Sequence, residues 1–163
     1  MEREIKYIGL YDIAGNGVRV SSPAAISKMD YICSSILNAG YKLHLISPSW
    51  FYDEVKNKPL LRKTVLKVNR KKQITFSPSI AFSGRITKFI KIFFSLSWLF
   101  FFLLKNAKKN EKIIVYHSPW LCLPVLLAKK IKGFYLVLEV EEIYSDVSSL
   151  HSFFDKLEIK IFK

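Results

Sequence analysis

The chain has 163 residues, of which 50% are hydrophobic and 15% aromatic, with six glycines and six prolines. This composition supports one domain with a sizeable core and excludes disordered, collagen-like and disulfide-scaffold proteins. Lysine and arginine outnumber the acidic residues 26 to 13, so the net charge is +13. Such a surplus indicates an anionic partner, which could be a membrane surface, a nucleic acid or a phosphorylated substrate.

The two cysteines, Cys33 and Cys122, stand far apart and have no CxxC spacing. They predict neither a disulfide framework nor a zinc site, and we expect both to be reduced and packed inside a cytoplasmic protein. The first residues lack the basic and then apolar order of a secretion signal. Nothing in the sequence calls for a metal or a cofactor.

A strand, a loop, a helix and a second strand open the chain. The β-rich run 5–11 leads into the glycine-containing loop 12–19. Apolar residues at helical spacing predict a helix over 24–39, which Gly40 ends, and 41–47 predicts the next strand. This order favours a parallel sheet.

The middle of the chain leaves two interpretations open. Residues 64–68 and 73–76 predict either two short strands around the basic run 69–72 or one strand and a basic loop. Neither interleaved aromatic residues nor a docking helix accompanies the basic run, so nucleic-acid binding is not favoured. A solvated surface or a contact with an anionic membrane explains the run better.

The stretch 85–112 contains the uncharged run 92–104, which is rich in Phe and Leu and has lysines on both sides. These 13 residues are fewer than the ~18–20 that a membrane span needs. We favour a core helix packed under the sheet. The alternative is a helix that also enters a membrane interface, where its lysines meet anionic head groups.

The last third again alternates between strand and helix. Residues 113–117 predict a buried strand, 121–131 a helix, 134–140 another strand and 151–163 a final helix. Together the elements predict an α/β fold, a Rossmann-like parallel sheet flanked by helices, in a single domain over residues 1–163.

In such sheets, ligands bind outside the carboxyl ends of the strands, near the point where the strand order reverses. If the strands 5–11 and 113–117 are neighbours there, the glycine loop and His117 face one crevice. Gly15, Asn16 and Gly17 form a GxG turn, but the dinucleotide pattern GxGxxG is incomplete. The loop suits a phosphate or a sugar, and a plain turn is the alternative.

His117 ends a buried-type strand and is followed by Ser118. Imidazole can act as a general base or bind a sugar hydroxyl, although a structural histidine is also common at a strand end. Glu142, with Glu139 and Glu141, could bind hydroxyl groups or a cation. The alternative is a solvated acidic strand exit.

The order of these elements resembles the N-terminal half of family 4 glycosyltransferases, which have the GT-B fold. The segments 113–119 and 135–145 carry most of the resemblance. It implies the acceptor-side domain of a nucleotide-sugar-dependent, hexosyltransferase-like enzyme of cell-surface polysaccharide synthesis. It also implies that Gly15 and Gly17 lie near the donor phosphates and that His117 lines the sugar site.

The resemblance further implies a lipid-linked or saccharide acceptor, and a peripheral, cytoplasmic location on an anionic inner membrane surface. Such enzymes are roughly twice as long, as two domains require. We therefore expect the chain to be truncated before the donor-binding domain and incomplete alone. One alternative is a non-catalytic membrane-anchoring subunit that recruits a separate donor-binding chain, and another is an unrelated nucleotide-binding module.

Overall fold

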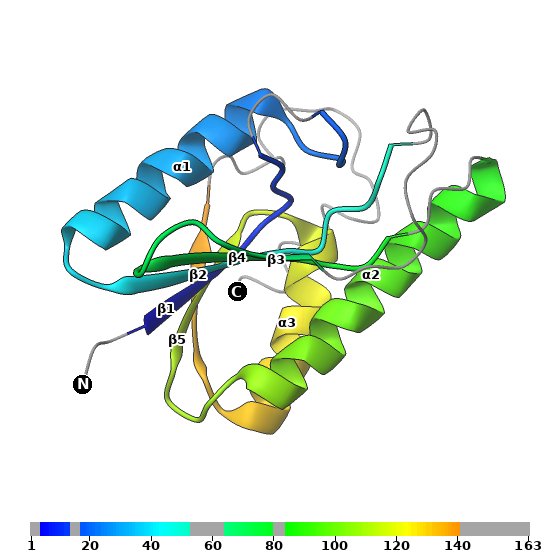
Figure 1. Ribbon diagram of the computed structural model, residues 1–163. Coiled ribbons are helices and arrows are strands. Elements are labelled where there is room, and N and C mark those ends of the chain that lie inside the picture. Colours follow the sequence, from blue (N-terminus) through cyan, green and yellow to red (C-terminus); the bar gives the residue numbers. More distant parts are fainter. Residues whose placement is uncertain (1–3, 14–16, 53–63, 80–83, 141–163) are drawn as a thin grey trace, which may run out of the picture.

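The computed structural model describes residues 4–13, 17–52, 64–79 and 84–140. They form one six-stranded sheet with the strand order β3-β4-β2-β1-β5-β6, flanked by three helices (Figure 1). The elements are β1 (Glu4–Ile8), α1 (Pro23–Asn38), β2 (Lys42–Ser47), β3 (Thr64–Lys67), β4 (Lys72–Phe76), α2 (Arg85–Asn106), β5 (Lys112–Tyr116), α3 (Pro119–Lys132) and β6 (Tyr135–Glu139).

The sheet is parallel except at β3, which runs antiparallel to β4. The α/β, Rossmann-like class is therefore confirmed, but a fully parallel sheet is wrong at this edge. Only residues 68–71 separate β3 from β4. A parallel crossover needs roughly a dozen residues, so this short connection must form a hairpin. Of the two interpretations of the middle region, the two-strand one is right.

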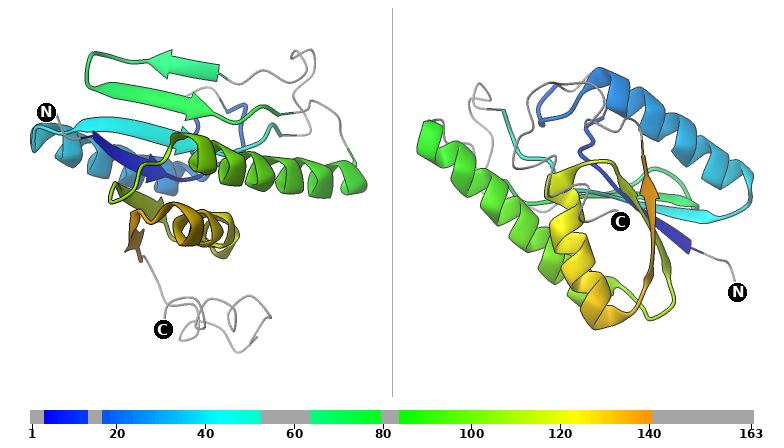
Figure 2. Two further views of the ribbon diagram at one scale, coloured as in Figure 1. Left: turned by 90° about the horizontal axis from the view of Figure 1, so that it is seen from below. Right: turned by 180° about the vertical axis from the view of Figure 1, so that it is seen from behind.

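Helix α1 covers one face of the sheet, and α2 and α3 cover the other (Figure 2). Strand β1 shows how the sequence supplies both cores. Tyr7 packs in the cluster with Met29 and Cys33 of α1, while the next residue, Ile8, packs in the cluster with Leu99 of α2. Alternate side chains of a strand point to opposite faces, so the consecutive apolar residues Tyr7 and Ile8 are buried on the two faces of the sheet.

Strand β1 ends at Ile8, and at the next residue, Gly9, helix α1 comes close to the sheet. A Cβ atom at Gly9 would lie 2.4 Å from Cε of Met29 and 3.2 Å from Cβ of Tyr116. Met29 is fully buried, so a residue without a side chain allows the helix to lie this near the strand. The predicted helix end is confirmed at Gly40, whose φ of 84° suits glycine.

Helix α2 has 22 residues and extends beyond both ends of the uncharged run 92–104. Its inner face packs against the sheet through Ser95, Leu99 and Leu103, all of which are buried. This packing confirms a core helix. Among the described residues, α2 is also the helix long and apolar enough to cross a membrane, judged by length and composition, with a mean hydropathy of 1.7.

Candidate functional site

The strand order reverses between β1 and β5. Strand β1 pairs with β2 on one side and with β5 on the other, where Lys6 lies opposite Ile113. Helix α1 follows β1 on one face of the sheet, and α3 follows β5 on the other face. The predicted neighbours are therefore confirmed, and a crevice at this reversal is where ligands bind in open α/β sheets.

Asp12 holds the loop that follows β1. Its side chain is buried, and its Oδ1 accepts a hydrogen bond of 2.8 Å from the backbone N–H of Ile13. Its Oδ2 accepts hydrogen bonds of 2.8 and 2.9 Å from the backbone N–H groups of Val18 and Arg19. One carboxylate therefore closes the loop from both of its ends. Three donors occupy its oxygens, so Asp12 is suited to support the loop.

A cavity of about 380 Å³ opens beside this loop. Gly17, the first turn of α1 and Tyr52 bound it. Gly17 has a φ of 56°, in the left-handed region that favours glycine. The N-terminal N–H groups of a helix carry a partial positive charge and attract anions and hydroxyl oxygens. Gly15 and Asn16 lie outside the described residues.

Arg19 joins the glycine loop to the loops that follow β2 and β4. Its guanidinium donates hydrogen bonds to the backbone oxygens of Ser49, at 2.5 Å, and Ser77, at 3.1 Å. The rings of Phe51 and Phe76 each lie 4.8 Å from its guanidinium carbon, within cation–π range. Burial lowers the pKa of Arg19 to about 10, so its charge persists at neutral pH.

Two Ser-Pro-Ser runs, 47–49 and 77–79, form a buried hydrogen-bonded base beneath the loop. The hydroxyl groups of Ser47 and Ser49 donate to the backbone oxygen of Tyr11 at 2.8 and 2.9 Å. The hydroxyl of Ser77 donates to the backbone oxygen of Ser49 at 3.1 Å. Buried hydroxyl groups with such partners make the carboxyl edge of the sheet rigid.

Sequence reasoning missed the roles of Arg19 and these serines. The signal that could have found the serines is the repetition itself, because one Ser-Pro-Ser run begins at the last residue of β2 and the other directly after β4.

His117 stands where it was predicted, directly after β5. Its side chain is 7% exposed, and it is not among the described residues that bound the cavity. Ser118 is the N-cap of α3, and its backbone oxygen accepts hydrogen bonds from the N–H groups of Leu121 and Cys122. Residues 14–16 of the glycine loop lie outside the described residues, so a single crevice shared by the loop and His117 stays a prediction.

Glu139, considered from the sequence with Glu141 and Glu142 for binding hydroxyl groups or a cation, makes contacts within the fold. Its carboxylate accepts a hydrogen bond from the Tyr7 hydroxyl and lies 3.3 Å from Nζ of Lys28. Glu139 therefore joins β6 to β1 and α1. Glu141 and Glu142 lie outside the described residues, as does the predicted helix 151–163.

The described residues contain no group of three or more His, Cys, Asp or Glu side chains that could hold a metal ion. Cys33 and Cys122 are both buried, as expected, and burial raises the pKa of the Cys33 thiol to about 12. An unreactive packing role fits both thiols.

No protein-family model matches the chain, and no curated protein is significantly similar to it in sequence. The function is therefore argued from the cavity and from the surfaces of the fold.

Proposed function

We propose that the chain is the acceptor-side domain of a nucleotide-sugar-dependent glycosyltransferase of cell-surface polysaccharide synthesis. The observation that carries the proposal is the cavity of about 380 Å³ beside the glycine loop, at the carboxyl end of β1 and next to the strand-order reversal. The likeness of the sequence to the N-terminal half of family 4 glycosyltransferases supports it as well.

In this proposal, the cavity holds the hydroxyl-rich or diphosphate-bearing part of the acceptor. The hydroxyl groups of Ser21 and Ser27 line it, and Gly17 lets the ligand approach the backbone. The acceptor hydroxyl attacks the anomeric carbon of the donor, and the bond from that carbon to the nucleoside diphosphate breaks. His117 and Ser118 lie one strand away, where they would orient the transferred sugar. A donor-binding domain supplies the contacts to the nucleotide.

A binding experiment with two matched glycine variants tests this proposal. Gly17 and Gly40 both have left-handed backbones, and a Cβ at either would meet no atom within 4 Å. Valine at either position costs about 1–2 kcal/mol in backbone strain. We expect saturation-transfer NMR to detect a polyprenyl-diphosphate-linked saccharide bound to the chain, with affinity at least ~10-fold weaker in Gly17→Val and unchanged in Gly40→Val. Equal losses in both variants, or no binding by the native chain, would refute the proposal.

A second observation favours the alternative of a membrane-anchoring subunit. Helices α2 and α3 pack against each other, and their outer sides expose large apolar side chains that are 49–78% accessible. On each of the two helices these side chains recur on one side, and exposed apolar side chains gathered in this way mark interaction surfaces. We call them together the apolar face. It consists of Ile86, Phe89, Ile90, Phe93 and Phe101 of α2 and Trp120, Leu123, Leu127 and Ile131 of α3.

The partner we propose for the apolar face is an anionic membrane surface on the cytoplasmic side. Exposed lysines flank it, with Lys88 near the start of α2, Lys105 near its end, and Lys129 and Lys130 near the end of α3. Lysine stems lie along apolar surface while their charges reach anionic head groups. Because the inner side of α2 is packed on the sheet, the helix would lie in the interface.

Vesicle co-sedimentation distinguishes this role from the acceptor-binding role. We expect Phe89→Ser with Phe93→Ser to weaken binding to vesicles of phosphatidylcholine and phosphatidylglycerol at least ~10-fold. The matched control, Tyr31→Ser with Tyr135→Ser, removes two aromatic rings outside the apolar face that are 75% and 60% exposed, and it should leave binding unchanged. The membrane role is wrong if the native chain does not sediment with the vesicles. If the chain instead dimerises through these phenylalanines, the partner of the apolar face is a second copy of the chain.

A further inference from the structure

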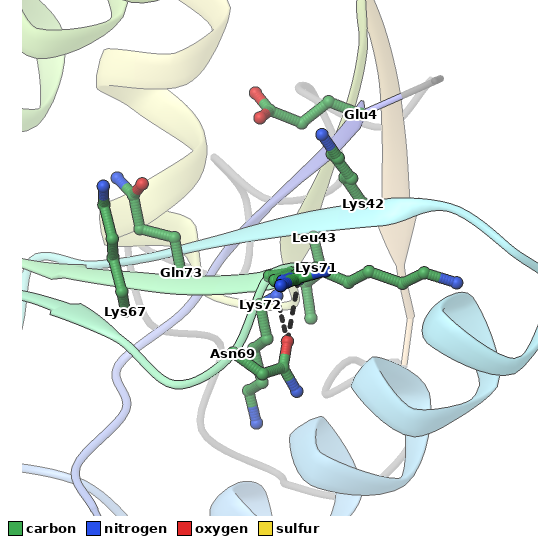
Figure 3. A pocket seen from close by; sticks show the side chains of 9 residues that line it. Glu4, Lys42, Leu43, Lys67, Asn69, Lys71, Lys72 and Gln73 are labelled. Atoms are coloured by element: carbon green, nitrogen blue, oxygen red, sulfur yellow. Dashed lines mark hydrogen bonds between the residues drawn. The ribbon is translucent and has the colours of Figure 1, made fainter.

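A larger cavity, of about 630 Å³, lies at the end of the sheet where the parallel strands begin, opposite the glycine loop (Figure 3). The first residues of β2 and β4 and the β3–β4 hairpin line it. Parallel strands all begin at one end of the sheet and finish at the other, so the length of a strand separates this cavity from the glycine loop. We call it the basic pocket.

The lining of the basic pocket is strongly positive. Glu4 is its acidic residue and lies 3.7 Å from Nζ of Lys6. Nζ of Lys72 lies 3.5 Å from Oδ1 of Asp30. Within the described residues, no carboxylate forms an ion pair with the other basic side chains of the hairpin, which are Lys67, Arg70 and Lys71. The basic side chains that line the pocket are Lys42, Lys67, Arg70, Lys71 and Lys72.

The hairpin holds these charges in a defined turn. Oδ1 of Asn69 accepts hydrogen bonds of 2.8 and 2.7 Å from the backbone N–H groups of Lys71 and Lys72. The side chains of Lys67 and Gln73 lie side by side on the paired strands, as their register requires (Figure 3). The charges therefore stand on an ordered β-hairpin.

Other lysines at this edge have a structural explanation that the hairpin cations lack. Lys129, Lys130 and Lys132 lie in the last turn of α3, where cations offset the negative end of the helix dipole. The basic pocket is lined by strands and a turn, so within the described residues no helix dipole offsets its charges. A bound anion would offset them.

We propose that the basic pocket binds a phosphate-bearing anion with more than one negative charge, either a lipid head group or a soluble diphosphate. A concave site focuses the positive potential of its walls, and the guanidinium of an arginine such as Arg70 can bind a phosphate through two hydrogen bonds. None of the described residues that line the pocket is aromatic, so it lacks the stacking surfaces of a nucleic-acid site.

The test uses the full chain, calorimetric titration with sodium pyrophosphate, and sedimentation with phosphatidylcholine vesicles that contain phosphatidic acid. The hairpin variant combines Lys67→Gln, Arg70→Gln and Lys71→Gln. The control combines Lys108→Gln, Lys109→Gln and Lys112→Gln, three exposed lysines at the start of β5, and removes the same charge from the same end of the strands. We expect the hairpin variant to bind at least ~10-fold more weakly than the control to one of the two probes.

The two probes distinguish the sources of the phosphate. A loss of pyrophosphate binding identifies a soluble anion, and a loss confined to vesicles identifies a head group. Equal losses of binding in the hairpin variant and in its control would mean that only the net charge matters, which would overturn the proposal. The proposal would also be overturned if the native chain bound neither probe. The Phe89→Ser, Phe93→Ser variant keeps its basic pocket, so its pyrophosphate binding should be native.

Discussion

Tyr7 joins three elements at the level of single atoms. It is fully buried in the central strand β1, and its hydroxyl donates to Glu139 of β6, which also meets Lys28 of α1. Burial, and then the hydrogen bond to the Glu139 carboxylate, raise the pKa of Tyr7 far above its usual range. The folded protein therefore holds this proton where an unfolded chain would release it.

We predict that Tyr7→Phe makes the alkaline loss of stability less steep. An unfolded tyrosine loses its proton near pH ~10, so the stabilisation from folded Tyr7 is complete below that pH and declines as the pH rises further. Urea unfolding from about pH 8 to about pH 11 measures this slope. Tyr31→Phe is the control, because that side chain is 75% exposed. A Tyr7→Phe slope as steep as that of the native chain contradicts the prediction.

Arg19 shows why part of the candidate site could not be predicted from the sequence. Its two backbone acceptors, Ser49 and Ser77, stand 30 and 58 residues further along the chain. Hydrophobic periodicity reports only neighbours along one strand or helix. The glycine loop and the strand-end position of His117 are local features and were predictable. The buried guanidinium that joins three loops depends on the assembled sheet.

At the scale of elements, α2 combines a core side with an exposed side. We predict that Leu99→Ala lowers the free energy of unfolding by about 2–5 kcal/mol, because it opens a cavity against the sheet. Leu99 is fully buried, whereas Phe93 on the same helix is 75% exposed. Phe93→Ala should therefore change stability by less than about 0.5 kcal/mol.

Urea unfolding of the two variants checks this assignment of sides. A cost of Phe93→Ala equal to that of Leu99→Ala would mean that the outer side is covered, which would also remove the apolar face as a docking surface.

Helix α2 lies within the stretch 85–112 considered from the sequence and extends past the uncharged run 92–104, because charged residues do not by themselves end a helix. Lys88 reaches solvent, and the buried Lys91 donates from Nζ to the backbone oxygen of Phe51 at 3.3 Å. The other long elements agree with their periodicity to within a few residues. The hairpin was ambiguous because strands of four and five residues carry too few positions for a pattern.

At the scale of the whole molecule, the α/β class was predictable from the alternation of strand and helix patterns. The adjacency of β1 and β5 could be stated only as a condition, since strand order depends on contacts between distant segments. The faces on which α1 and α3 lie were not predictable, because a hydrophobic pattern does not say on which face of the sheet each helix packs.

The central place of β1 also has a consequence for synthesis on the ribosome. The β1–α1–β2 unit emerges first and can assemble early, since its contacts are near in sequence. The other side of β1 pairs with β5, and Lys6 meets Ile113 more than 100 residues later. Until those residues leave the ribosomal tunnel, one edge of β1 stays unpaired, and unpaired strand edges are prone to aggregation. We therefore expect the nascent chain to be most prone to aggregation before β5 is synthesised.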